Sequence, residues 1–310
     1  MTENRRKPMA PLEWGLLIVL SIFWGGSFLF VGIAVSDFQP VSIAFIRVAI
    51  ATVVLWIIVI ALRIEIPTKP GLWASFLILG AINGAIPFTL IAWGQSHIAS
   101  GLASILIAAT PVIAVVAAHF LTTDEPMTIG RLVGVIAGLL GVIVLIGPAA
   151  LGELGSGLFG QLAIILAATF YALAGIFGRR FSKQGVPPLV IATGQVSAST
   201  VLLLPMVLLV DQPWLLAAPS PRAWLAVGSL GIISTAIGYL LYFRVLATAG
   251  ATNLLLVNFL VPVTAILLGI LVLDELLLLQ HIGGLLLIAG GLALIDGRAT
   301  KNLRRPGNVI

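Results

Sequence analysis

The chain has 310 residues, of which 60% are hydrophobic and 9% are charged, and its formal net charge is +5. Soluble domains carry roughly 25% charged residues, so this composition excludes a soluble globular protein and indicates one embedded in a lipid bilayer. The absence of cysteine excludes disulfides and thiolate metal sites, and basic residues that lie between apolar runs, not in patches, argue against a nucleic-acid partner.

Ten apolar runs are long enough to span a bilayer, which takes about 17–25 residues in a helix. They cover residues 12–34, 41–62, 72–95, 101–121, 129–147, 157–178, 187–210, 222–245, 252–273 and 280–296. Their length and their Leu-, Ala- and Gly-rich composition without alternation indicate helices and not strands. The first run lacks a small-x-small cleavage site, so we expect a retained helix and not a signal peptide. The predicted fold is an all-α, polytopic membrane protein.

The basic residues predict its orientation, because cytoplasmic loops are enriched in Lys and Arg. With the N-terminus inside, fourteen of the 16 Lys and Arg fall in cytoplasmic segments, while Arg222 lies outside and Arg47 lies within the second run. We therefore predict ten transmembrane helices with both termini in the cytoplasm. Residues 1–11 and 297–310 are the predicted terminal tails.

Residues 100–125 and 251–275 are two versions of one stretch. Each opens on small or polar residues, contains a proline in mid-run (Pro111 or Pro262) and ends at an Asp-Glu pair. A proline in an apolar run breaks the helical hydrogen-bond ladder. In hydrocarbon this is tolerated where neighbouring protein or a wet cavity satisfies the freed groups. Paired breaks of this kind indicate a transporter-like binding site.

The duplication extends over the rest of the chain. Trp24 matches Tyr171, and Pro40 matches Pro187, both at an offset of 147 residues. We therefore predict two five-helix repeats, at residues 12–147 and 157–296. Because five is odd, the second repeat enters the membrane from the opposite side, and inverted repeats are a common basis of alternating access.

Three features identify a family resemblance: Phe-Trp-Gly-Gly-Ser-Phe at residues 23–28, Phe45-Ile46-Arg47 in the second run, and the repeated proline-to-glutamate stretch followed by a glycine-rich run. With these features the chain resembles the EamA-like branch of the drug/metabolite transporter superfamily over nearly its full length. Within that branch it is similar to bacterial exporters of aromatic and other amino acids. The resemblance implies a monomer in the bacterial inner membrane, with a homodimer as the alternative. It also implies that all helices but the fifth and tenth surround a central cavity.

The pairs Asp124-Glu125 and Asp274-Glu275 have two readings, proton coupling or helix capping. Capping is favoured, because acids and an early proline are typical of a helix start. No Asp or Glu lies in the middle of a run, where the carboxylates of proton relays are found. The sequence also has no phosphate-binding loop for ATP. We predict a facilitator or exchanger without a cofactor or a metal site.

Arg47 is the one Lys or Arg that does not lie at the end of a predicted span or outside the spans. Burying it unpaired would cost at least about 2.5 kcal/mol. It could bind a substrate carboxylate, or it could serve the structure by reaching the surface or nearby carbonyl groups. The structural role is favoured, but Arg47 remains a candidate substrate-binding residue.

Aromatic and amide side chains near mid-span are further candidates, with helix packing as their alternative role. The predicted substrate-binding residues, besides Arg47, are Trp24, Asn83, Phe88, Tyr171, Tyr239, Tyr242 and Asn258. Pro87, which follows Asn83 and Gly84, indicates a bend in the third span. Pro87, Pro111 and Pro262 are therefore the predicted hinge positions.

An aromatic and nearly uncharged cavity suits small amphipathic solutes. We expect export of aromatic and neutral amino acids by alternating access, with a small-molecule substrate and the bilayer as the partners. A multidrug exporter of hydrophobic cations is the alternative, although such a site would hold a buried acid among its aromatic rings. A receptor or scaffold is a third reading. The scattered histidines form no catalytic constellation, so we do not expect an enzyme.

Overall fold

The computed structural model describes residues 11–122, 129–146, 156–215, 217–249, 254 and 256–296. All regular elements in these ranges are helices, and all but the 3-10 helix at Pro213–Leu215 overlap the predicted runs. Seven helices are long and apolar enough to span a membrane, and three shorter apolar helices lie at Leu132–Val144, Leu260–Leu273 and Leu279–Gly291. The all-helical prediction is confirmed, while ten crossings and the orientation of the termini stay predictions.

The helices follow one another with short connections. In chain order they are α1 (Pro11–Ala34), α2 (Pro40–Ala61), α3 (Pro70–Gly80), the π-helical η1 (Ala81–Ala85), α4 (Ile86–Gln95), α5 (Ser100–Ile107), α6 (Thr110–Leu121), α7 (Ile129–Ile146), α9 (Ser156–Lys183), α10 (Pro188–Met206), the π-helical η2 (Val207–Asp211), the 3-10 helix η3 (Pro213–Leu215), α11 (Pro221–Ser229), the π-helical η4 (Leu230–Ile237), α12 (Gly238–Ala249), α14 (Val257–Leu273) and α15 (Leu279–Asp296). Proline opens α2, α3, α10 and α11, because its missing N–H would be unpaired in a first turn in any case.

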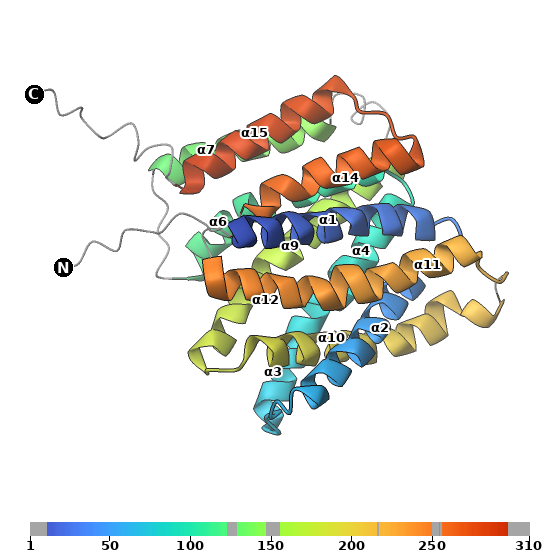
Figure 1. Ribbon diagram of the computed structural model, residues 1–310. Helices are drawn as coiled ribbons and strands as arrows, with labels where there is room; N and C mark the ends of the chain where they lie inside the picture. The colour runs from blue at the N-terminus through green and yellow to red at the C-terminus, as the bar shows by residue number, and fades with distance from the viewer. Residues whose placement is uncertain are drawn as a thin grey trace, which may run out of the picture.

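The helices form a bundle, with α7 and α15 side by side along one edge (Figure 1). Glycines allow this pair to approach closely. A Cβ atom on Gly141 would come within 2.8 Å of the Gly284 carbonyl oxygen, and one on Gly291 within 2.8 Å of the Gly138 nitrogen. The glycine faces of these two helices therefore pack against each other within one chain.

The helices α2 and α10 also pack against each other, and a symmetric contact joins them. The hydroxyl groups of Thr52 and Thr200, which are 148 residues apart, form a hydrogen bond of 2.9 Å. Proline opens both helices, at Pro40 and at Pro188. The residue equivalent to Pro40 is therefore Pro188 and not Pro187, so the predicted offset of 147 is wrong by one residue for this pair of helices.

Two further glycines show the same equivalence. A Cβ atom on Gly80 would lie 2.7 Å from the carbonyl oxygen of Gln195, and one on Gly231 would lie 3.0 Å from the carbonyl oxygen of Arg47. Each glycine belongs to one half of the chain and touches the other half. Gly80 of the first half approaches Gln195 of the second, and Gly231 of the second half approaches Arg47 of the first. Gln195 therefore occupies the position that is equivalent to Arg47.

Carboxylates bind backbone N–H groups at one end of the bundle, where α1 ends and α2 begins. Asp37 Oδ2 accepts a hydrogen bond of 2.7 Å from the backbone nitrogen of Ser220, directly before α11. Asp211 Oδ2 accepts bonds of 2.6 and 2.7 Å from the nitrogen and the hydroxyl of Ser42, in the first turn of α2. Each contact joins the two halves of the chain. We call this end the carboxylate end.

Glu275 makes the third contact of this kind. Its carboxylate accepts bonds of 2.6 Å from the Ser100 nitrogen and 2.9 Å from the Gly101 nitrogen, at the start of α5. Capping was predicted for the Asp274-Glu275 pair, but for α15, the helix that follows it. Glu275 instead caps a helix of the other half. The pair Asp124-Glu125 lies outside the described residues.

The two proline stretches differ in structure. A turn at residues 108–109 separates α5 from α6, and Pro111 lies in the first turn of α6. The Thr110 hydroxyl donates a bond of 2.6 Å to the carbonyl of Ile107, which is the group that the missing N–H of Pro111 leaves free. Pro262, by contrast, lies inside the continuous helix α14. Their role as hinges stays a prediction.

Candidate functional site

Arg47 lies on α2, and only 8% of it is exposed. Its Nε atom donates a hydrogen bond of 2.8 Å to the hydroxyl of Thr235 in η4. Its guanidinium carbon lies 3.8 Å from the centre of the Phe88 ring on α4, an arrangement in which the ring attracts the cation by about 0.5–2 kcal/mol. The side chain therefore points into the bundle and does not reach the surface.

Thr235 is prepared to accept this bond by the π-helical turn around it. Its hydroxyl donates its one proton to the carbonyl of Leu230, at 2.7 Å and five residues earlier in the chain. The lone pairs of the oxygen are then available to Arg47. The bond spans 188 residues, so it ties α2 of the first half to η4 of the second.

The guanidinium group keeps unused donors. It carries five N–H groups, and Thr235 is the one hydrogen-bond acceptor that the described residues provide for it. The carboxylates whose contacts are described lie at helix ends, as Asp211 and Glu275 do. Arg47 is thus a buried cation that can still bind an acceptor group supplied by a ligand.

Aromatic rings surround the guanidinium group. Phe88, beneath it, meets the ring of Tyr171 on α9 edge to face, with ring centres 6.5 Å apart. Tyr171 and Tyr239 are both close enough to Arg47 to interact with its charge. The rings come from both halves of the chain, so the surface around Arg47 is shared between them.

A second group of rings continues from Tyr239 along α12. Tyr239 stacks on Phe243 at 6.3 Å, and Phe243 meets Tyr242 at 5.2 Å. Tyr242 in turn stacks on Trp24 of α1, with ring centres 5.6 Å apart and planes inclined by 28°. The indole fits there because the neighbouring residue Gly238 has no side chain: a Cβ atom would lie 2.8 Å from the Trp24 Nε1 atom.

An amide pair lies beside Tyr239. Asn83 of η1 donates a hydrogen bond of 2.9 Å from Nδ2 to Oε1 of Gln195 on α10, and Gln195 also lies beside the Tyr239 hydroxyl. Gln195 is 5% exposed. Sequence reasoning missed it, although a polar residue in an apolar run at an offset of 148 from Arg47 was a usable signal.

The position of Asn83 depends on the π-helical turn η1. Pro87 lies in the first turn of α4, directly after η1. Because proline has no N–H, the carbonyl of Asn83, four residues earlier, receives no helical hydrogen bond from it. Single π-helical turns inside helices are frequent at functional sites. The turn directs the Asn83 side chain toward α10.

The structure thus brings most of the predicted residues together. The set that we call the Arg47 cluster comprises Arg47, Trp24, Asn83, Phe88, Tyr171, Tyr239 and Tyr242, with Gln195, Thr235 and Phe243 added. Asn258, on α14, makes no hydrogen bond or ring contact with the described residues of this cluster. Thr235 carried no signal in the sequence, because hydroxyl groups in apolar helices commonly bond to their own backbone.

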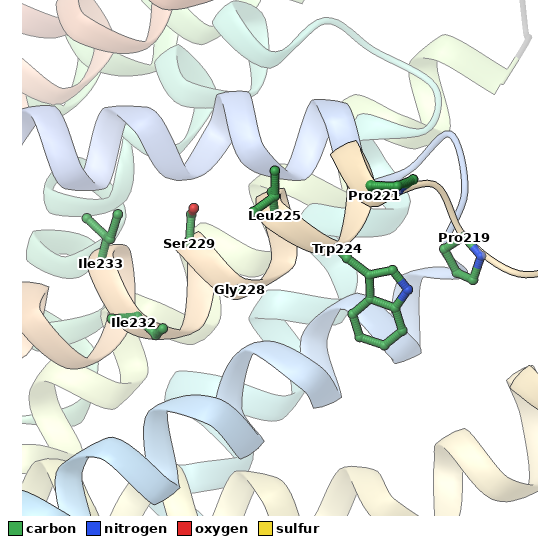
Figure 2. Close-up of a pocket in the computed structure, with 8 residues that line it drawn as sticks. All are labelled: Pro219, Pro221, Trp224, Leu225, Gly228, Ser229, Ile232 and Ile233. Atoms are coloured by element: carbon green, nitrogen blue, oxygen red, sulfur yellow. The ribbon is translucent and has the colours of Figure 1, made fainter.

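A groove of about 730 Å³ lies elsewhere, along α11 and η4. Figure 2 shows its lining of mostly apolar side chains: Pro219, Pro221, Trp224, Leu225, Gly228, Ser229, Ile232 and Ile233. Leu225 is 74% exposed. None of the predicted site residues lines this groove, and its apolar exposed wall is what a helix facing lipid presents.

Comparisons with known proteins agree with one another. The model of the EamA-like transporter family matches residues 13–147 and again residues 158–296. The uncharacterized transporter YoaV of Bacillus subtilis is 26% identical over 89% of this chain and 94% of that protein. An uncharacterized transporter of Archaeoglobus fulgidus is 27% identical over 91% of this chain and 98% of that protein.

The uncharacterized inner membrane transporter YedA of Escherichia coli K12 is 26% identical, over 86% of this chain and 84% of that protein. A solved crystal structure superimposes with a TM-score of 0.67 at 20% identity, over 95% of this chain and 99% of the other. At this identity the structural likeness shows the fold alone. With its two family matches, this multi-pass chain is a membrane transporter that belongs to the EamA-like family of the drug/metabolite transporter superfamily.

Proposed function

We propose that the protein exports small amphipathic metabolites across the bacterial inner membrane, with aromatic and neutral amino acids as its main substrates. It works by alternating access between the two inverted halves, as a facilitator or an exchanger. The excess of basic residues in the predicted inner segments supports cytoplasmic termini. In that orientation the carboxylate end faces outward.

The observation that carries this proposal is the buried guanidinium of Arg47 with its unused donors. A buried charge that keeps one neutral hydrogen-bond acceptor and one aromatic face is poorly compensated. A substrate carboxylate would bind it through short, charge-assisted hydrogen bonds, for which the planar fork of arginine is suited. The surrounding rings of Phe88, Tyr171 and Tyr239 suit an apolar or aromatic body on the same molecule.

The residues of the cluster also support transport without a dedicated coupling ion. The acids whose positions are described lie at helix ends or in loops, whereas proton relays place carboxylates within the membrane. The hydrogen bonds that cross between the halves, such as Arg47–Thr235 and Asn83–Gln195, involve neutral partners on at least one side. The gradient of the substrate itself then drives its movement.

A hydrophobic-cation exporter is the alternative that the aromatic pairs support, since stacked rings such as Trp24 and Tyr242 attract cations. Arg47 opposes it, because a second positive charge would be repelled in the same low-dielectric site. The amino-acid exporter should therefore transport carboxylates and not hydrophobic cations, and the cation exporter should do the reverse.

Counterflow in proteoliposomes tests the proposal. Vesicles loaded with unlabelled phenylalanine should accumulate external radiolabelled phenylalanine, without ATP or an imposed proton gradient. Arg47→Met should reduce the initial rate at least about 10-fold, since hydrogen bonds to a charged group contribute roughly 1.5–3 kcal/mol. Arg222→Met is the matched control, because it removes one cation from the start of α11, and it should transport as the wild type does.

Uptake of ethidium or a similar cation with no movement of amino acids would refute the proposal in favour of the cation exporter. Equal rates for Arg47→Met and the wild type would remove Arg47 from the substrate site. Gel filtration and the melting temperature of each variant in detergent should accompany the rates, so that a folding defect is recognised as such.

A further inference from the structure

The equivalence of Arg47 and Gln195 gives the substrate site two unlike ends. Each residue lies five positions before the threonine, Thr52 or Thr200, through which α2 and α10 bond to each other. Each reaches a π-helical turn of the opposite half: Arg47 bonds to η4, and Gln195 bonds to Asn83 in η1. The positions are equivalent, but one side carries a charge and the other does not.

The two ends differ in what they offer a ligand. The guanidinium group consists of donors alone. Asn83 donates one N–H group to Gln195, and its carbonyl oxygen Oδ1 accepts no hydrogen bond from the described residues. Asn83 is half-buried, so a ligand can supply the donor that this oxygen lacks. One end therefore suits an anion, and the other suits an ammonium group or another N–H donor.

The spacing limits how far apart the two groups of the ligand can be. Phe88, which lies beneath the guanidinium, follows Asn83 by five residues, which is less than two helical turns. Tyr239 is close to both Arg47 and Gln195, which agrees with a short span. A ligand that carries its carboxylate and its ammonium on one carbon atom suits two ends that share Tyr239 as a neighbour.

We propose that the Asn83–Gln195 pair binds the ammonium group of the substrate, so that the transporter selects α-amino acids over carboxylates without an amino group. The inference rests on the proposed function and assigns Gln195 and Asn83 as specificity-determining residues of that same site. A site built to hydrogen-bond a substrate N–H group rejects the analogue that lacks it, because its own polar groups are then left unpaired.

Three compounds that share a phenyl ring test the assignment: phenylalanine, 3-phenylpropionate and phenethylamine. Each competes with labelled phenylalanine in the counterflow assay, and the concentration for half inhibition is measured. In the wild type, phenylpropionate should compete at least about 10-fold more weakly than phenylalanine, as expected for the loss of a hydrogen bond to a charged group. Phenethylamine, which has no carboxylate for Arg47, should not compete.

The double variant Asn83→Leu/Gln195→Met replaces both amides by apolar side chains of similar volume, which leaves neither partner unpaired. It should raise the half-inhibition concentration of phenylalanine at least about 10-fold and leave that of phenylpropionate unchanged. The preference for the amino acid then disappears. Arg47→Met should raise the half-inhibition concentrations of both acids. Thr52→Val/Thr200→Val is the matched control, because it removes a different hydrogen bond between the two halves, from α2 to α10, and it should keep the preference.

The half-inhibition concentrations of both acids could instead rise by the same factor in the double variant. Asn83 and Gln195 would then only join the helices, and the inference would be wrong while the proposed function stands. A wild type that does not distinguish the two acids would overturn it as well. Failure of the wild type to transport either acid would instead refute the proposed function itself.

Discussion

The two ends of the bundle hold the halves together in different ways. At the carboxylate end, Asp37, Asp211 and Glu275 each accept hydrogen bonds from backbone N–H groups of the opposite half. At the opposite end, the ring of Phe76 on α3 stacks on that of Phe181 on α9, with centres 5.3 Å apart. One end is joined by charge-assisted bonds and the other by apolar packing.

The two kinds of contact should differ in how easily they separate when an end of the bundle opens. Charge-assisted hydrogen bonds are directional, and they exchange readily with water once the groups are wet. Buried aromatic rings lose packing contacts when they separate, and those contacts have no replacement in an empty space. In the proposed alternating-access cycle both ends open in turn, so the two kinds of contact should respond differently to substitution.

The largest effect is expected at the aromatic contact. Phe76 and Phe181 are fully buried, at 0% exposure each. Phe76→Ala should lower the free energy of unfolding by about 3 kcal/mol, because it leaves a cavity against Phe181. Thermal unfolding in detergent measures the loss. Phe120→Ala is the control, since Phe120 is 78% exposed; an equal fall in its melting temperature would show that the contact between the halves is not the cause.

An intermediate effect is expected at Glu275. Glu275→Gln removes the charge and one of the two acceptor oxygens that bind Ser100 and Gly101, which should cost about 2 kcal/mol. The chain has no cysteine, so a single cysteine at Ser104, one turn further along α5, can report opening. We expect faster labelling of it by an impermeant maleimide added from the carboxylate end.

The neighbouring residue supplies the control for this experiment. Asp274 has a φ of 53°, a left-handed conformation that asparagine also tolerates, so Asp274→Asn removes the adjacent charge without strain. It should leave the labelling rate unchanged. If it raises the rate as much as Glu275→Gln does, the local charge and not the link to α5 holds this end closed.

The smallest effect is expected at Asp37, whose side chain lies near the surface where salt screens it. Hydrogen bonds from the Ser220 side chain and backbone, and then from Ser36, hold the pKa of this carboxyl below its usual 3.8. A lowered pKa means that the stabilisation is present above the unfolded value and is lost as the pH falls through the folded one. The melting temperature of the wild type should therefore exceed that of Asp37→Asn at neutral pH. This difference should begin to shrink as the pH falls below about 4 and vanish once the folded carboxyl is protonated, and a difference that grew on acidification would contradict the link.

The positions of the helices could be predicted from the sequence because run length and composition determine them locally. The partner of Glu275 could not, because Ser100 lies 175 residues away and a helix start offers its N–H groups to any nearby acid. The turn η1 has a local signal in Pro87, whereas η4 contains no proline. The hydrogen-bond geometry of Thr235 in η4 could therefore not be predicted from the sequence.

Gln195 shows how small an error hides a site residue. An offset of 147 places Gly194 opposite Arg47, while the offset of 148 that the structure shows places Gln195 there. One residue turns a side chain by about 100° around a helix, since a turn takes about 3.6 residues. The connections between helices differ in length in the two halves, so no single offset aligns all of them.

The Thr52–Thr200 bond has a consequence for motion. In the proposed alternating-access cycle the two inverted halves exchange conformations, and two equivalent atoms that touch each other are then carried onto each other, so their contact is unchanged. A contact away from the axis is instead carried to the opposite membrane face, and Glu275 is carried onto position 125, which is also a glutamate. In the proposed cycle the threonine pair is thus a fixed point, while the contact of Glu275 with the start of α5 is not.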